Sequence, residues 1–293
     1  MSTYALIGIT GNVGGRAALK LLESGARVRA VVRSEEKGTP WKAKGAEVAV
    51  AEIDDAMALQ KAFTGVDGAF VMTPTWFASE DMFAENRKAI STLGKALRAA
   101  AVPKVVFLSS IGAHRPHGTG AILKLHEMEQ ALGDLSSLTS LRAGWFMENY
   151  LGMIAYAKES GVLPSLLDHL DRPISMIATS DIGDQVARLL QENWSGQRIV
   201  ELEAPERYSP NDVASTLTKV LKRPVKAEVL PHEQWESTYR SWGLTIGSAK
   251  AMAEMVDGFN KEWIVFEEPS QSVRGVTGLE KFFAKAVGSC PRP

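Results

Sequence analysis

The sequence predicts an α/β protein of the Rossmann type: a doubly wound parallel sheet followed by a small, discontinuous α/β subdomain. Strand-like and helix-like segments alternate over residues 1–150, as they do in successive βαβ units. The first strand runs into a glycine-rich turn that opens a helix. Several strands are near-continuous apolar runs, such as residues 28–32, and this is typical of parallel strands buried on both faces.

The expected elements of this first part follow in order. A strand over Tyr4–Ile9 leads through the glycine turn into a helix over Val13–Glu23, because apolar residues recur there at helical spacing. The further strands are expected at Val28–Val32, Glu47–Ala51, Ala69–Met72, Val105–Leu108 and Leu138–Arg142. The helices between them are expected at Ala56–Phe63, Met82–Ala100 and Ala121–Leu132.

The alternation loosens after residue 150. A helix is expected over Asp181–Gln191, capped by Ser180 or Asp181, and a strand over Gln197–Glu203. Another helix follows over Pro210–Leu221, with Ser209 as its N-cap and Asp212 placed for a capping box. We therefore expect a dinucleotide-binding domain over 1–150, completed by 174–203, and a smaller substrate subdomain over 151–173 and 204–293.

Composition excludes several functional classes. The formal net charge is -1, so no basic surface favours nucleic acid or an anionic membrane. Cys290 is the one cysteine, which rules out an intramolecular disulfide. The first residues lack the pattern of a signal peptide, and no apolar run approaches the ~20 residues that span a membrane. The expected location is the cytoplasm, as a monomer or homodimer.

The glycine-rich turn is the strongest functional motif. Its sequence is Gly8-Ile9-Thr10-Gly11-Asn12-Val13-Gly14, with a strand before it and a helix after it. Glycines allow a tight turn and a close backbone approach to a pyrophosphate, while the helix N-terminus supplies unpaired N–H groups. The alternative is a plain βα turn. The context favours a dinucleotide site that includes Gly8 and Gly14.

The end of the second strand indicates which dinucleotide binds. An NAD site usually carries an acidic residue there, to bond the ribose 2′-hydroxyl. Here Arg33 ends the strand and Lys37 follows, and both can pair with a 2′-phosphate. Glu35 and Glu36 are expected to point outward. Solvated surface charges are the alternative, but the pattern favours NADP(H) over NAD(H).

Several segments together resemble the NmrA-like family of atypical short-chain dehydrogenases/reductases. They are the loop GITGNVG, the strand end VVR, Glu52-Ile53-Asp54-Asp55, VVFLSS at 105–110 and LRAGWFMEN at 141–149. Residues 209–220 and 278–283 resemble the family's C-terminal elements. The resemblance implies a Rossmann fold with a nicotinamide cofactor. Some members are NADPH-dependent reductases of quinones, azo or triphenylmethane dyes, or plant phenolic ethers; others are non-catalytic redox sensors.

The same resemblance implies positions for the cofactor. Those at the pyrophosphate are Thr10, Gly11, Asn12 and Val13. Those at the adenosine end are Arg33 and Lys37 at the 2′-phosphate and Glu52 and Ile53 near the adenine. Thr73 and Pro74 would border the nicotinamide ribose. Gly144, Trp145 and Phe146 would line the nicotinamide and substrate side.

The catalytic residues are less clearly marked. Most short-chain reductases use Tyr-x-x-x-Lys with the tyrosine as proton donor, but here Gly120 precedes Lys124 at that spacing. Lys124 and His126 lie on one expected helix, so Lys124 could bond the ribose while His126 donates a proton. Ser110, at the end of the fifth strand, could orient the substrate. The alternatives are surface residues for the first two and a loop cap for Ser110.

Aromatic residues suggest a planar acceptor. Trp145, Phe146 and Tyr150 are the expected substrate contacts, within a wall that also draws on Trp76, Phe77 and Trp242. Ordinary core packing is the alternative for each of them. His114 and His117 have no third ligand at a recognisable spacing, so no metal site is expected.

These observations lead to one favoured function and one alternative. The favoured function is an NADPH-dependent oxidoreductase that passes a hydride to a small aromatic acceptor, of a quinone, azo or enone kind. The missing tyrosine favours the alternative, a non-catalytic NADP(H)-sensing regulator that binds a protein partner. A mobile cap between Tyr150 and Pro173 would favour the enzyme, because a lid excludes water from the hydride.

Overall fold

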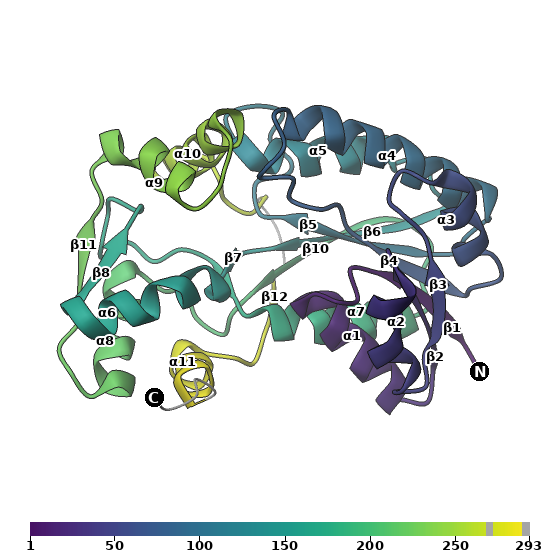
Figure 1. Cartoon of the computed structure of the whole chain (residues 1–293), viewed down its shortest axis with the longest axis horizontal. Coiled ribbons are helices and arrows are strands. Elements are labelled where there is room, and N and C mark those ends of the chain that lie inside the picture. Colours follow the sequence, from purple (N-terminus) through teal and green to yellow (C-terminus); the bar gives the residue numbers. More distant parts are fainter. Residues whose placement is uncertain (268–271, 289–293) are drawn as a thin grey trace.

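A parallel eight-stranded sheet forms the centre of the computed structural model, which describes residues 1–267 and 272–288 (Figure 1). Cys290 lies outside the described residues. The strand order is β12-β10-β6-β5-β4-β1-β2-β3. The strands are β1 (Thr3–Ile7), β2 (Arg27–Val32), β3 (Glu47–Val50), β4 (Gly68–Val71), β5 (Val105–Ser110), β6 (Ser137–Ala143), β10 (Gly196–Glu203) and β12 (Val273–Arg274). The predicted doubly wound Rossmann fold is confirmed.

Helices cover both faces of this sheet (Figure 1). One face carries α1 (Asn12–Glu23), α2 (Glu35–Lys42) and α7 (Thr179–Gln191). The other carries α3 (Ala56–Phe63), α4 (Met82–Ala99) and α5 (Leu123–Ala131), which follows the short 3₁₀ helix η1 (Gly120–Ile122). None of the helices in the described part of the chain is long and apolar enough to cross a membrane.

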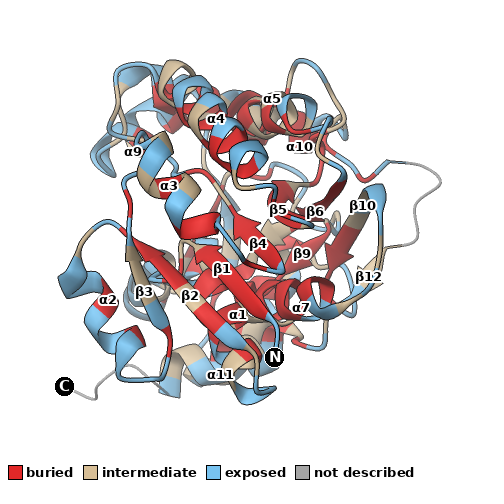
Figure 2. Ribbon diagram, turned by 90° about the vertical axis from the view of Figure 1, so that its right-hand side faces the viewer, coloured by how far each residue is buried: buried red, intermediate tan, exposed pale blue. Residues whose placement is uncertain are grey.

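The core forms two apolar layers because successive side chains of a strand point to opposite faces. On β1, Leu6 packs in the cluster with α1 and α7, while Ala5 packs in the cluster with α3 and α4. Phe63 of α3 and Leu93 of α4 are fully buried in the second cluster, and Leu21 of α1 in the first. Figure 2 shows the resulting band of buried residues through the sheet.

A smaller lobe lies beside the carboxyl ends of the strands (Figure 1). It contains a parallel pair, β8 (Val162–Ser165) with β11 (Lys226–Val229). A second pair, β7 (Trp145–Phe146) with β9 (Met176–Ile177), joins the two parts. The helices of the lobe are η2 (Met147–Met153), α6 (Ile154–Ser160), α8 (Pro210–Leu221), η3 (His232–Gln234), α9 (Trp235–Ser241), α10 (Ile246–Asn260) and α11 (Leu279–Gly288). The capping box of Ser209 and Asp212 is present as expected.

The C-terminal part of the chain also completes the large sheet. Strand β10 pairs with β6 along seven positions, from Ser137 opposite Gly196 to Ala143 opposite Leu202. Arg142 on β6 has 3% of its side chain exposed and forms ion pairs with Glu129 of α5 and Glu267, both at 2.7 Å. The contact with Glu267 connects β6 to a segment 125 residues further along the chain.

Two elements differ from those expected. Helix α2 was expected as a turn, but its Ser34 N-cap accepts the N–H of Lys37, and Pro40 within it is the residue that obscures a helix. Helix α7 begins at Thr179 instead of Asp181, and neither Ser180 nor Asp181 caps it. The Glu148 carboxylate accepts the Thr179 N–H instead, so the cap comes from another part of the chain.

Candidate functional site

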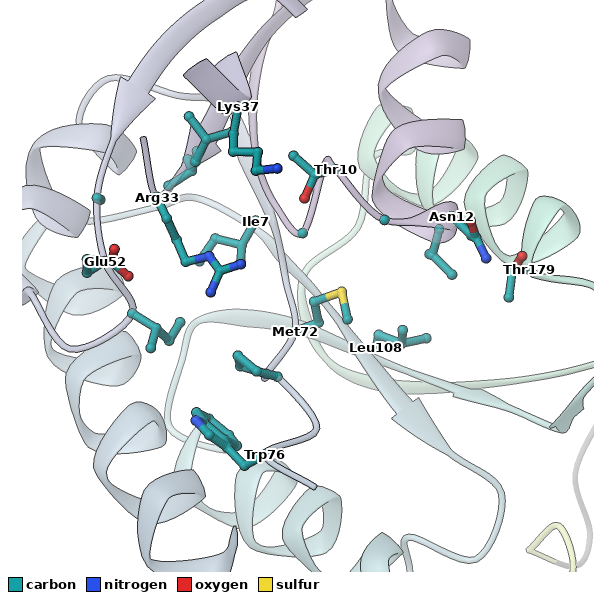
Figure 3. A pocket seen from close by; sticks show the side chains of 18 of the residues that line it. Ile7, Thr10, Asn12, Arg33, Lys37, Glu52, Met72, Trp76, Leu108 and Thr179 are labelled. Carbon is teal, nitrogen blue, oxygen red and sulfur yellow. The ribbon is translucent and has the colours of Figure 1, made fainter. Parts of the chain in front are cut away.

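A cavity of about 840 Å³ lies at the carboxyl ends of the strands, where the strand order turns back between β1 and β4. Parallel α/β sheets bind their ligands at such a switch point, and the volume lies within the usual range for a cofactor site. Figure 3 shows the cavity. Its lining residues are Ile7, Gly8, Thr10, Gly11, Asn12, Val13, Val31, Val32, Arg33, Lys37, Ala51, Glu52, Ile53, Leu59, Met72, Pro74, Trp76, Leu108, Phe146, Glu148 and Thr179.

The glycine-rich turn forms one wall of the cavity. Gly8 has φ +72°, and a Cβ there would lie 2.5 Å from the Met72 sulfur. A Cβ on Gly14 would lie 2.4 Å from the Gly8 carbonyl oxygen, so helix and turn pack backbone against backbone. Gly11, the N-cap of α1, offers no side-chain acceptor to the first-turn N–H groups. Unpaired N–H groups at a helix N-terminus fit a pyrophosphate.

Two basic residues lie at the same end as the turn. Arg33 directly follows β2, which ends at Val32, and Lys37 lies in the first turn of α2. Both side chains are exposed, and no ion pair joins either of them to a carboxylate in the described part of the chain. Figure 3 shows Arg33, Lys37 and Thr10 close together around the cavity. Glu52 and Ile53, after β3, complete this end. The arrangement suits a phosphorylated adenosine.

The opposite end of the cavity combines apolar side chains with one carboxylate. Met72, Leu108 and Phe146 are its apolar members. Glu148, in η2, accepts the Thr179 N–H at 3.0 Å and the Thr179 hydroxyl at 2.5 Å. Figure 3 shows Thr179 beside Asn12, so the N-termini of α7 and α1 meet here. This end suits a ring that is partly apolar and partly polar.

Lys124 lies behind the β4–α4 segment at the edge of the cavity. Only 7% of the residue is exposed, and its Nζ donates to the Pro74 carbonyl at 3.4 Å. The Phe77 ring centroid lies 5.9 Å from the same atom. Burial without a charged partner lowers the pKa of Lys124 to about 8. Asn86 of α4 donates to the Lys124 backbone carbonyl at 2.9 Å, which fixes the start of α5.

The fold agrees with what comparisons of sequence and structure find. The model of the NmrA-like family matches residues 1–283. The chain belongs to the NmrA-like family. Its sequence is 26% identical to quinone oxidoreductase 2 of Escherichia coli over 261 residues, 88% of each chain. It is 25% identical to the NAD(P)H azoreductase of Xenophilus azovorans over 251 residues, 85% of each chain.

Solved structures show the same fold over the whole length. The NADPH-dependent quinone oxidoreductase of Escherichia coli superimposes with a TM-score of 0.80 at 25% identity, covering 97% of this chain and 99% of that one. The triphenylmethane reductase of Citrobacter sp. has a TM-score of 0.81 at 19% identity, covering 98% and 100%. At that lower identity the likeness concerns the fold alone.

Most cofactor residues expected from the sequence line one cavity in this NmrA-like protein. They are Gly8, Thr10, Gly11, Asn12, Val13, Arg33, Lys37, Glu52, Ile53 and Pro74. Gly14 is absent from the lining and acts through packing instead. Thr73 is 6% exposed and its hydroxyl has no partner. Gly144 is also a packing position, because a Cβ there would lie 2.6 Å from the Ser175 carbonyl oxygen.

The expected aromatic wall is only partly formed. Phe146 and Trp76 line the cavity, and Trp76 adopts an unusual φ of +48°. Trp145 does not line it and packs edge-on against Phe259 at 5.1 Å. Tyr150 was expected to contact the substrate, but it does not line the cavity. Instead η2 turns its ring into the core of the smaller lobe, where burial raises the pKa of its hydroxyl. Trp242 is 54% exposed on the surface.

Of the three catalytic candidates, Lys124 bonds a lining residue directly, through its Nζ and the Pro74 carbonyl oxygen. His126 does not line the cavity, and its Nδ1 lies 2.8 Å from the Ala113 carbonyl oxygen. Ser110 ends β5 without lining the cavity. His117 stacks on Trp263 at 5.5 Å. In residues 1–267 and 272–288, no three His, Cys, Asp or Glu side chains form a group that could hold a metal.

Sequence reasoning missed several lining residues. Met72, Leu108, Glu148 and Thr179 line the cavity without having been expected there. Glu148 had a signal, since it stands two residues after Phe146 in a segment already assigned to the nicotinamide side. Thr179 had none, because it meets Glu148 from 31 residues away.

Proposed function

We propose that this NmrA-like protein passes a hydride from NADPH to a small planar aromatic acceptor, of a quinone, azo or enone kind. The chain is an NAD(P)H-dependent oxidoreductase. The bound cofactor supplies the hydride. The protein binds and orients the cofactor and the acceptor, and it excludes water. One observation carries the proposal: an uncapped, glycine-rich helix N-terminus and two unpaired basic residues border the same cavity as an apolar end.

The cofactor choice rests on Arg33 and Lys37. A 2′-phosphate is the group that distinguishes NADPH from NADH, and a guanidinium can bind it through two parallel hydrogen bonds. Both residues border the cavity, and among the described residues no carboxylate forms an ion pair with either of them. Glu52 lies on the same side but belongs to the loop after β3, which leaves it free to contact the adenosine.

A tyrosine proton donor is not available to this protein. Gly120 stands where that tyrosine would be, with φ +51°, and a Cβ there would lie 2.0 Å from the Ala251 carbonyl oxygen. The position therefore cannot accept a larger residue. Lys124 is the group we assign to the proton or to the ribose, since its pKa of about 8 leaves it mostly protonated at neutral pH. An electron-poor acceptor needs little further acid catalysis.

The acceptor class rests on flat, apolar surfaces near Lys124. Phe146 and Trp76 line the cavity from different elements, and Phe77 lies beside Lys124. Planar rings stack favourably on such side chains. The quinone and azo reductases among the relatives act on acceptors of this kind.

The test is NADPH oxidation at 340 nm with a panel of quinones, azo dyes and enones, run in parallel with NADH. We expect turnover of at least one acceptor and a preference for NADPH. Arg33→Ala should raise the KM for NADPH about tenfold or more, because a charge-assisted hydrogen bond contributes roughly 1.5–3 kcal/mol. Arg240→Ala, an exposed arginine of α9 that does not line the cavity, is the matched control.

Two outcomes would overturn the proposal. Tight NADP(H) binding without turnover of any acceptor would favour a non-catalytic sensor of the nicotinamide pool. Equal KM values for NADPH and NADH, unchanged in Arg33→Ala, would remove the assignment of the 2′-phosphate to Arg33.

A further inference from the structure

Glu148 is a carboxylate at the apolar end of the cavity. It follows Phe146 by two residues, and both line the cavity. The Thr179 N–H donates to Oε1 at 3.0 Å and to Oε2 at 3.1 Å, and the Thr179 hydroxyl donates to Oε1 at 2.5 Å. These bonds fix the carboxylate and leave further lone pairs, since a carboxylate offers about four acceptor sites.

No cation in the described part of the chain neutralises this carboxylate. Within the described ranges, 1–267 and 272–288, no lysine, arginine or histidine forms an ion pair with Glu148. Arg33 and Lys37 belong to the other end of the cavity, beyond the glycine-rich turn (Figure 3). Thr179, which bonds the carboxylate, is neutral, and the other lining residues assigned to this end, Met72, Leu108 and Phe146, are apolar. A negative charge in such surroundings is weakly screened.

We propose that Glu148 stabilises the oxidised, positively charged nicotinamide ring and so assists hydride transfer. This inference rests on the proposed function, which puts the adenosine at Arg33 and the nicotinamide at the Glu148 end. When the hydride leaves, the ring loses two electrons and one proton and becomes a cation, and the acceptor gains that hydride and later a proton. A carboxylate held in place beforehand lowers the energy of this developing charge without having to reorganise.

A purely structural role for Glu148 makes a different prediction. As a cap of α7 it would stabilise the helix N-terminus by the same amount whatever the redox state of the cofactor. Charge stabilisation acts on the two redox states differently. It tightens binding of NADP⁺ relative to NADPH, because only NADP⁺ carries the positive ring. The ratio of the two dissociation constants therefore separates the roles.

The experiment compares Glu148→Gln with Thr179→Val in the full-length protein. Glu148→Gln keeps the shape and removes the charge, whereas Thr179→Val removes one hydrogen bond to the carboxylate and keeps the charge. Dissociation constants are measured for NADPH by its fluorescence and for NADP⁺ by calorimetry. The melting temperature of each variant reports the loss of the cap. Steady-state kcat is measured with the best acceptor of the panel.

The expected result is a change in the ratio for one variant only. Glu148→Gln should raise Kd(NADP⁺)/Kd(NADPH) about tenfold, equivalent to about 1.4 kcal/mol, and lower kcat. Thr179→Val should lower the melting temperature. It should leave Kd(NADP⁺)/Kd(NADPH) within about twofold of the wild-type value, well short of a tenfold change.

An unchanged ratio in a folded Glu148→Gln variant would overturn the inference and leave Glu148 as a helix cap. In that case the wild type still binds both nucleotides, and the proposed function stands. Binding of neither nucleotide to the wild type would instead overturn the proposed function together with the inference.

Discussion

The adenosine end and the nicotinamide end of the cavity are built in different ways. Segments close in sequence, the Gly8–Gly14 turn and residues 33–37, form most of the first, and in the turn backbone packs closely against backbone. The second draws on Met72, Leu108, Phe146 and Thr179, which come from separate elements. Where the backbone itself packs at a site, few substitutions are tolerated. Where side chains from several elements form a site, each of them can be substituted independently. We therefore expect affinity for the cofactor to depend mainly on the first end, and reactivity on the second.

The largest effect should come from the backbone contact at the adenosine end. We expect Gly14→Ala to weaken NADPH binding by more than about 100-fold, or about 2.7 kcal/mol, because its Cβ would lie 2.4 Å from the Gly8 carbonyl oxygen. Helix α1 would have to move away from the turn. Titration of NADPH fluorescence measures the loss.

Gly152→Ala is the control for that substitution, since a Cβ there meets nothing within 4 Å. Its affinity for NADPH should equal that of the wild type. Wild-type affinity in Gly14→Ala would show that the turn tolerates a side chain, and the contrast between the two ends would not hold.

A smaller effect, at the nicotinamide end, should follow from Lys124. Lys124→Met should lower kcat/KM about tenfold, below the ~10²–10⁴-fold range of general acid–base catalysis, because an electron-poor acceptor needs little acid. Wild-type kcat/KM should fall as pH rises above the Lys124 pKa of about 8, and the variant should lack that step. His126→Gln is the control, because its ring is held by the Ala113 carbonyl. Loss of the step in His126→Gln instead would make His126 the proton donor.

Lys124→Met should lower activity but raise the stability of the protein. Burial lowers the pKa of Lys124 from 10.5 to about 8, so the folded state binds fewer protons than the unfolded state between these values. The cost in folding free energy of burying the charged amine is complete below pH 8. It shrinks as the pH rises towards 10.5 and is absent above that pH. Lys124→Met should therefore raise the free energy of unfolding at pH 7 by about 1–3 kcal/mol. Denaturant titration at pH 7 and at pH 10 measures the difference, and an equal gain at both would contradict the burial of a charge.

The smallest effect should come from Lys37. It is exposed in the first turn of α2, so water and salt screen its charge. We expect Lys37→Ala to raise the KM for NADPH about threefold, close to the ~0.2–1 kcal/mol of an exposed ion pair, and to leave NADH unaffected. Lys42→Ala, an exposed lysine of the same helix away from the cavity, is the control. A larger effect from Lys42 would mean that general charge, and not a phosphate contact, sets the preference.

The adenosine end could be predicted from sequence because its determinants are local. Gly8, Gly11 and Gly14 are recognisable from spacing and from the strand and helix around them. Arg33 is recognisable because it ends a strand at a fixed distance from those glycines. Helix α2 was missed because Pro40 and a weakly amphipathic sequence obscure it.

The nicotinamide end was less predictable because its residues meet only in the folded chain. Lys124 was a candidate, but its burial depends on Pro74, 50 residues away. Glu148 and Thr179 act together, and neither has a local pattern that indicates the other. Tyr150 was assigned to the substrate from its aromatic character alone, and composition does not say that η2 turns it into a core.

The pairing of β10 with β6 limits how this chain can be shortened or recombined. A fragment that ended near residue 150 would leave the seven paired positions of β6 as an open, unprotected edge, and such edges promote aggregation. Arg142 would lose Glu267 and keep only Glu129 within ion-pair distance. A chimera that exchanges the smaller lobe with that of a relative therefore needs at least two crossover points, one on each side of α7 and β10. Acceptor range can be altered by transplanting the lobe only if the last strands of the sheet stay with their host.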